Sequence, residues 1–281
     1  MKHFEFSYKN PSGIEIYGQG WEPDKNKPRA AVLLVHGLGE HSGRYLHVAK
    51  VFCEKGFTVF ASDRAGHGKS KGKRGHIKKY EHYFDEVHKL HAEAVRKYAD
   101  IACFAYGHSM GGGIVLNYML SKKRTGLAGI ITTGAALELN FNPPKGKLFM
   151  GKLMRFIYPA FTERRSLDIN QLSKDPEVVK AYRNDPLAHN KITAVTGLGI
   201  INYGKKALEK VGKVNVPLLI MHGADDGITS PSGSEKFAKK AQGDVTLRIW
   251  EGLRHEIHNE PEQKEVLKTI TDWMIAKLRE K

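Results

Sequence analysis

The chain has 281 residues, of which 41% are hydrophobic and 27% are charged, an ordinary composition for a globular protein. Its 45 Lys and Arg residues exceed its 30 Asp and Glu residues by a formal net charge of +15, but no zinc-finger spacing, aromatic RNA-binding motif or long basic run accompanies the excess. We therefore do not expect nucleic acid as a partner. A solvated Lys-rich surface is the first interpretation, and attraction to an anionic membrane surface is the second.

Two further features bear on the compartment. No apolar run approaches the roughly 18 residues needed to span a bilayer, and the first residues lack the apolar core of a secretory signal. Cys53 and Cys103 lie in apolar segments, which favours two reduced, buried thiols over a disulfide. We expect a cytoplasmic protein that can associate peripherally with membranes or lipid droplets.

The N-terminal residues predict an antiparallel hairpin, because apolar residues alternate over His3–Tyr8 and Ile14–Trp21 around a turn at Asn10-Pro11-Ser12-Gly13. Short continuous apolar runs then alternate with helix-like stretches, which predicts a mostly parallel sheet covered on both faces. The apolar runs are Ala30–Val35, Phe57–Ala61, Ala102–Tyr106, Gly129–Thr132, Pro217–Met221 and Val245–Trp250. The helix-like stretches include Tyr83–Tyr98, Gly111–Leu120, Ser232–Ala241 and Glu262–Leu278.

One region departs from this alternation. From about Leu137 to Leu208 there is no clear strand, and large apolar residues are interleaved with Lys and Arg over Lys145–Tyr158. We expect a helical insertion that caps a single catalytic domain, with the core formed by residues 1–136 and 209–281 and the cap by residues 137–208.

The strongest local motif is Gly107-His108-Ser109-Met110-Gly111, which fits the G-x-S-x-G nucleophile elbow. A predicted strand precedes it and a predicted helix follows it. A strand-to-helix turn this tight leaves no room for side chains beside the serine, hence the glycines. The motif predicts that the Ser109 hydroxyl lies at the carboxyl end of the sheet, where the helix N-terminus faces a developing oxyanion.

A serine hydroxyl needs an adjacent base to act as a nucleophile at neutral pH, and in this fold the acid and then the histidine follow the serine along the chain. We assign His255, after the last predicted strand, as general base and then general acid. We assign Asp226, after the preceding strand, as the carboxylate that orients it. Asp225 stays open as the carboxylate, and His258 and His222 stay open as weaker candidates for the base.

An oxyanion hole needs two backbone donors aimed at the developing charge. The first expected donor is the N–H of Met110, directly after the candidate nucleophile. The second is the N–H of Leu38, in the loop His36-Gly37-Leu38-Gly39 that follows an early predicted strand.

These blocks together resemble the monoglyceride lipases, with lysophospholipases as near relatives, over residues 36 to 260. The resemblance implies an α/β-hydrolase fold and favours Asp226 over Asp225. The blocks that carry it are His36–Tyr45, Asp63-Arg64-Ala65-Gly66-His67-Gly68-Lys69-Ser70, Gly107–Gly112, Gly223-Ala224-Asp225-Asp226 and Arg254-His255-Glu256-Ile257-His258-Asn259-Glu260.

The resemblance also implies a substrate pocket. Glu40, Arg44 and His258 match positions that hold a glycerol head group, and Tyr182 matches a tyrosine of the same pocket. A salt bridge that braces the loop is the alternative for Glu40 and Arg44. The family's cap forms an apolar tunnel for one acyl chain and touches the membrane. The Lys145–Tyr158 stretch suits either an interfacial helix or a helix that covers the acyl pocket.

The expected reaction is hydrolysis of monoacylglycerol to glycerol and a fatty acid, through an acyl-enzyme on Ser109 and a water activated by His255, with no metal and no organic cofactor. A lysophospholipase, a general carboxylesterase or an acyltransferase would use the same residues on another substrate. A non-catalytic hydrolase-fold protein that binds a small molecule is the alternative from a different class.

Overall fold

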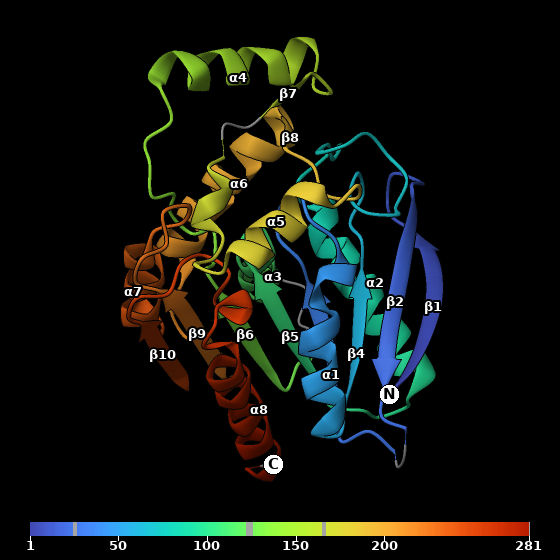
Figure 1. The fold of residues 1–281 in the computed structure, drawn as a ribbon. Helices are drawn as coiled ribbons and strands as arrows, with labels where there is room; N and C mark the ends of the chain where they lie inside the picture. Colours follow the sequence, from blue (N-terminus) through green and yellow to red (C-terminus); the bar gives the residue numbers. More distant parts are fainter. Residues whose placement is uncertain (25–26, 122–125, 165–166, 281) are drawn as a thin grey trace.

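Eight strands form one central sheet in the part of the chain that this computed structural model describes, residues 1–24, 27–121, 126–164 and 167–280 (Figure 1). Their order is β1-β2-β4-β3-β5-β6-β9-β10. The strands are β1 (Lys2–Lys9), β2 (Glu15–Glu22), β3 (Ala30–Val35), β4 (Phe57–Ser62), β5 (Cys103–His108), β6 (Gly129–Thr133), β9 (Leu218–Gly223) and β10 (Val245–Trp250). From β4 to the last strand of this order, β10, each strand pairs in parallel with its neighbour. Strands β1 and β2 form the antiparallel hairpin, and β2 also pairs antiparallel with β4.

The continuous apolar runs became the central strands. Every residue of β3, β4, β5, β6 and β9 is buried, as expected for strands covered on both faces. The prediction of a mostly parallel α/β-hydrolase sheet is confirmed. Strand β10 lies at the edge and leaves part of its length exposed.

Helices cover both faces of the sheet. Helices α1 (Leu46–Glu54) and α8 (Gln263–Arg279) pack into one apolar core with side chains such as Phe52 and Ile270. Helices α2 (His82–Lys97), α3 (Met110–Leu120) and α7 (Pro231–Lys240) pack into the core on the other face with side chains such as Leu90, Ile114 and Phe237. This arrangement holds the carboxyl ends of β5, β9 and β10, and the loops that follow them, at one edge of the sheet (Figure 1).

The segment between β6 and β9 is mainly helical. It contains α4 (Lys145–Ile157), the 3-10 helix η2 (Ile169–Gln171), α5 (Pro176–Asn184) and α6 (Ala194–Lys210). The expectation that it has no strand is wrong, because β7 (Thr162–Arg164) pairs with β8 (Lys191–Thr193) in an antiparallel two-stranded sheet. Three residues per strand are too few to show a period of two in the sequence.

Two helices of this segment differ in how they pack. Helix α6 contacts α3 and α7, and its Val195 and Ala207 join the core on that face of the sheet. Helix α4 contacts α6, has no buried residue and lies at the top of Figure 1, away from the central sheet. Within the described residues, no helix is both long and apolar enough to cross a membrane.

Candidate active site

The backbone of Ser109 has the geometry of a nucleophile elbow. Ser109 joins β5 to α3 with a φ of 54° and a ψ of −119°, a region that residues with a side chain rarely adopt. Its carbonyl oxygen accepts hydrogen bonds from the backbone N–H groups of Gly113 (3.1 Å) and Ala136 (2.9 Å). The surrounding structure therefore holds this strained residue in place.

The two flanking glycines are sterically required. A Cβ on Gly107 would lie 2.5 Å from the carbonyl oxygen of Gly111. A Cβ on Gly111 would lie 2.0 Å from the carbonyl oxygen of Val35, at the end of β3. Because both distances are far below a van der Waals contact, the G-x-S-x-G pattern is explained by the close approach of α3 to β3 and to its own turn.

His255 reaches one of the two adjacent carboxylates. Its Nδ1 lies 2.7 Å from Oδ2 of Asp226, whose side chain is fully buried. Asp225 is exposed, and its backbone N–H donates to the carbonyl oxygen of Leu253 at 2.9 Å. The geometry thus pairs His255 with Asp226 and leaves Asp225 outside the site.

Asp226 is held as a carboxylate by several donors. Its Oδ1 accepts from the backbone N–H groups of Ile228 (2.8 Å) and Thr229 (2.9 Å), and its Oδ2 accepts from the Thr229 hydroxyl (2.8 Å). His222 Nε2 lies 2.9 Å from the same Oδ2. Burial raises the pKa of Asp226, but the neighbouring His255 and His222 outweigh it and hold that pKa well below its usual range.

The pKa of His255 responds to opposing effects. Burial lowers it, whereas the charge of Asp226, the hydrogen bond to Asp226 and the charges of Glu256 and Glu40 raise it, and the result lies above the usual histidine pKa. An imidazole in this environment gains a proton readily and is stabilised once it is charged.

Ser109 and His255 line the same small cavity, of about 30 Å³. Since one water molecule needs roughly 10–15 Å³, this space has room for about two. The wall also includes Leu38, Glu40 and Tyr182, three of the residues singled out from the sequence. The rest of the wall is formed by Gly37, His108, Leu167, Leu172, Ile228 and Glu256.

Two of the expected head-group residues are not among the cavity-lining residues. Arg44 pairs with Glu40 (2.8 Å) and Glu256 (2.7 Å), so the ion pair considered as the alternative is present. His258 is buried and packs against Tyr45 and His108, with ring centroids 5.0 and 4.7 Å away. Burial lowers the pKa of His258 to about 3, which keeps this ring neutral.

The loop expected to supply an oxyanion donor is fixed from both sides. The N–H of Gly37 donates to Glu40 Oε1, and its carbonyl oxygen accepts from the buried Arg64 guanidinium at 2.7 Å. Leu38 follows Gly37 in the cavity wall, and Met110 begins α3 directly after Ser109. The first N–H groups of a helix have no partner within the helix, so this end of α3 suits an anionic oxygen.

Two residues of this site, Glu256 and Arg64, were not predicted from the sequence. The signals available for them were the position of Glu256 next to His255 and that of Arg64 in a glycine-rich block, and neither predicts a contact. In the described ranges of the chain, no group of His, Cys, Asp or Glu side chains is placed to hold a metal ion.

The chain is similar to known proteins over most of its length. The family model described as "Serine aminopeptidase, S33" matches residues 26–262. A monoacylglycerol lipase of Mycolicibacterium smegmatis is 34% identical over 276 residues, which cover 98% of each chain. A Dictyostelium discoideum protein described as an uncharacterized abhydrolase domain-containing protein is 38% identical over 256 residues, 90% of this chain but 27% of that longer protein.

The fold recurs in a crystal structure of a soluble variant of the monoglyceride lipase of Saccharomyces cerevisiae in complex with a substrate analogue. The TM-score is 0.87 at 25% identity, and the match covers 99% of this chain and 96% of the other. The chain therefore belongs to the monoglyceride lipase family of the α/β-hydrolase superfamily.

Proposed function

We propose that this protein hydrolyses monoacylglycerol to glycerol and a fatty acid, with Ser109, His255 and Asp226 as its catalytic triad. The observation that carries the proposal is that Ser109, in an elbow conformation, shares a cavity with His255, which in turn contacts Asp226 at 2.7 Å. Family membership supports the lipid ester as the substrate class, because the M. smegmatis and S. cerevisiae relatives are a monoacylglycerol lipase and a monoglyceride lipase.

In the proposed reaction, His255 removes the proton of Ser109 as its Oγ attacks the ester carbonyl. The N–H groups of Leu38 and Met110 stabilise the oxyanion. His255 then gives its proton to the departing glycerol oxygen, which leaves an acyl-enzyme. A water molecule deprotonated by His255 attacks the acyl carbonyl and releases the fatty acid, while Asp226 stays ionised and stabilises the imidazolium. No cofactor takes part in this scheme.

A second cavity is large enough and apolar enough to hold an acyl chain. It has a volume of about 460 Å³ and lies between α4, α6 and the segment after β6, within the size range of ligand pockets. We propose that residues 137–208 act as a cap on the core formed by residues 1–136 and 209–281, and that this cavity takes the chain. Its apolar lining includes Leu137, Leu139, Phe141, Leu148, Ile200, Ile201 and Leu208.

The polar end of the substrate needs partners near Ser109. We propose that Glu40 and Tyr182 contact the glycerol hydroxyls, because both line the cavity that contains Ser109. We place Arg44 and His258 behind this contact. Arg44 fixes Glu40 through their ion pair, and His258 packs against the cavity residue His108.

The outer surface of α4 supports contact with a lipid surface. Phe149, Phe156 and Ile157 expose 69%, 84% and 69% of their area, and Lys145, Lys147, Lys152 and Arg155 lie on the same helix. Exposed aromatic residues beside cations suit the boundary between head groups and acyl chains. We propose peripheral association of a cytoplasmic protein with membranes or lipid droplets.

The test compares three lauroyl esters of equal chain length: the glyceryl ester, the glycerophosphocholine ester and the nitrophenyl ester. The proposal expects the highest kcat/KM on the glyceryl ester. Faster cleavage of the glycerophosphocholine ester would favour a lysophospholipase. Cleavage of the nitrophenyl ester alone would favour a general esterase, and cleavage of none would favour a small-molecule binder.

A further inference from the structure

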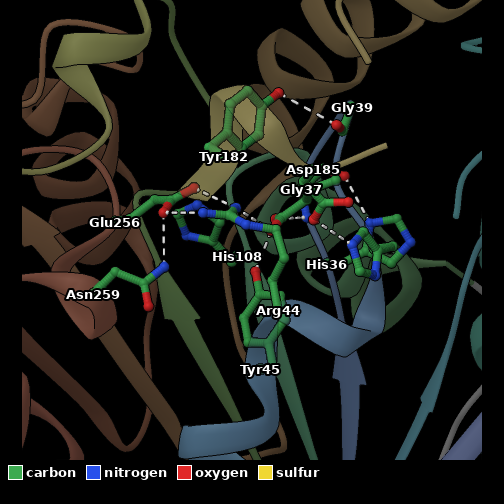
Figure 2. Close-up of polar contacts among 12 residues, drawn as sticks. His36, Gly37, Gly39, Arg44, Tyr45, His108, Tyr182, Asp185, Glu256 and Asn259 are labelled. Carbon is green, nitrogen blue, oxygen red and sulfur yellow. Dashed lines mark hydrogen bonds and ion pairs between the residues drawn. The ribbon is translucent and has the colours of Figure 1, made fainter. Parts of the chain in front are cut away.

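A three-member ion bridge joins two loops of the site that are far apart in the sequence. Arg44 lies in the 3-10 helix η1 (Ser42–Tyr45). Its Nη1 is 2.8 Å from Glu40 Oε2. Its Nη1 and Nη2 also lie 2.7 Å from Oε1 and 2.8 Å from Oε2 of Glu256, respectively (Figure 2). The Glu256 contact has the two-pronged geometry that arginine forms with a carboxylate.

Each end of the bridge touches a part of the proposed machinery. Glu40 accepts the backbone N–H of Gly37, the residue before the proposed oxyanion donor Leu38. Glu256 directly follows His255 in the chain and also accepts from Nδ2 of Asn259 at 2.7 Å (Figure 2). The bridge thus connects the loop after β3 to the loop after β10.

The bridge is buried and has unequal charge. The side chains of Glu40 and Glu256 are 3% and 2% exposed, and that of Arg44 is 11% exposed. Burial raises the pKa of Glu256, but the Arg44 guanidinium outweighs it and holds that pKa well below its usual range. Two acidic side chains share one cation, so the group has a surplus of negative charge, and both acidic residues line the cavity that contains His255.

Several other titratable groups act on His255 or pack against it. Asp226 contacts its Nδ1, and the His108 ring packs against the His255 ring. The His258 ring packs in turn against the His108 ring. The charged and titratable groups around this base are Asp226, Glu256, Glu40, Arg44, His108, His222 and His258. Burial lowers the pKa of both His108 and His258, so these two rings are neutral near pH 7.

We propose that Glu256 is a positioning residue of the hydrolysis: through Arg44 and Glu40 it ties the oxyanion loop, the segment after β3 that carries Leu38, to the histidine loop, the segment after β10 that carries His255. Glu256 and His255 are adjacent and line the same cavity, so the charge of Glu256 also favours the protonated imidazole. The inference rests on the proposed function, because it requires His255 to act as the base. Glu256 acts on the reaction through other groups and forms no bond to the ester. Its charge acts on the imidazolium that forms when Ser109 attacks, and the bridge keeps Leu38 at a fixed distance from that reaction.

The test separates the charge from the bridge with two variants of the full chain, assayed on a nitrophenyl ester. Glu256→Gln keeps the shape and removes the charge. We expect the acidic limb of kcat/KM, which reports the pKa of the base, to move down by about half a pH unit or more. Arg44→Lys keeps the charge but cannot fork across two carboxylates. We expect kcat to fall about tenfold while the acidic limb moves by less than about 0.2 unit.

Glu262→Gln is the matched control, because Glu262 is exposed and pairs with Lys174 at the surface. The Glu262→Gln variant should keep the wild-type kcat and the wild-type acidic limb of kcat/KM. The inference is overturned if Glu256→Gln keeps both the wild-type limb and the wild-type kcat. If the Glu256→Gln variant does not fold, the inference is overturned instead by an Arg44→Lys variant that keeps the wild-type kcat. A wild-type protein that shows no Ser109-dependent turnover overturns the proposed function and this inference together, whereas the first two results overturn the inference alone.

Discussion

Replacing Gly111 by alanine should damage catalysis without altering any proposed catalytic side chain. The added Cβ would lie 2.0 Å from the Val35 carbonyl oxygen and 2.7 Å from that of His36, whereas real Cβ contacts stay above 3.0 Å. The start of α3 must therefore move by about 1 Å from the end of β3, where the oxyanion loop begins, and a displacement of that size costs about 100-fold in rate. Overpacking adds about 1–3 kcal/mol of destabilisation.

The control is Gly113→Ala, two residues further along α3, where the nearest atom to the new Cβ is the Ala136 carbonyl oxygen at 3.2 Å. Alanine is a better helix former than glycine by about 1 kcal/mol, so helix propensity alone predicts that both variants gain stability. We measure kcat/KM on a nitrophenyl ester and the midpoint of thermal unfolding. A Gly111→Ala protein with the activity and stability of Gly113→Ala would refute the steric argument.

Three further predictions follow from individual side chains. Asp226→Asn should lower kcat by about 10⁴-fold and Asp225→Asn should leave it unchanged, because Asp226 is the one of these two carboxylates that contacts His255; equal losses in a steady-state assay would contradict the assignment. Burial raises the pKa of Glu86 to about 7, so its ionisation destabilises the fold as the pH rises from about 4.5 through 7. Glu86→Gln should therefore raise the free energy of unfolding in urea by about 3 kcal/mol more at pH 9 than at pH 4. An equal effect at both pH values would argue against a raised pKa of Glu86. Phe156→Glu should reduce flotation with anionic vesicles and leave nitrophenyl ester hydrolysis intact, whereas unchanged flotation would exclude α4 as the contact.

Local patterns predicted the parts of the fold that local sequence determines. The run that became β3 matched its strand because a fully buried strand must be continuously apolar. The elbow could be located because steric crowding leaves only glycine at Gly107 and Gly111. The choice between Asp225 and Asp226 could not be made from local pattern alone, because adjacent residues of a turn point in different directions.

Features that depend on packing between distant segments could not be predicted. Arg44 and Glu256 are 212 residues apart, and nothing in either segment identifies the other as its partner. The resemblance implied that His258 holds the head group, but in η3 (Ile257–Asn259) its ring is buried against Tyr45 of η1 and His108 of β5, two residues far from it in the sequence. The pairing of β7 with β8 likewise depends on the path of the chain between them.

The central claim is that Ser109 is the nucleophile of a monoacylglycerol lipase. The most direct test measures glycerol and fatty-acid release from monolaurin by the wild type and by Ser109→Ala, with circular dichroism to confirm that both are folded. We predict rapid, equimolar release by the wild type and a loss of about five orders of magnitude or more in kcat for the variant. Release by Ser109→Ala at the wild-type rate would contradict the account, as would a wild type that leaves monolaurin intact.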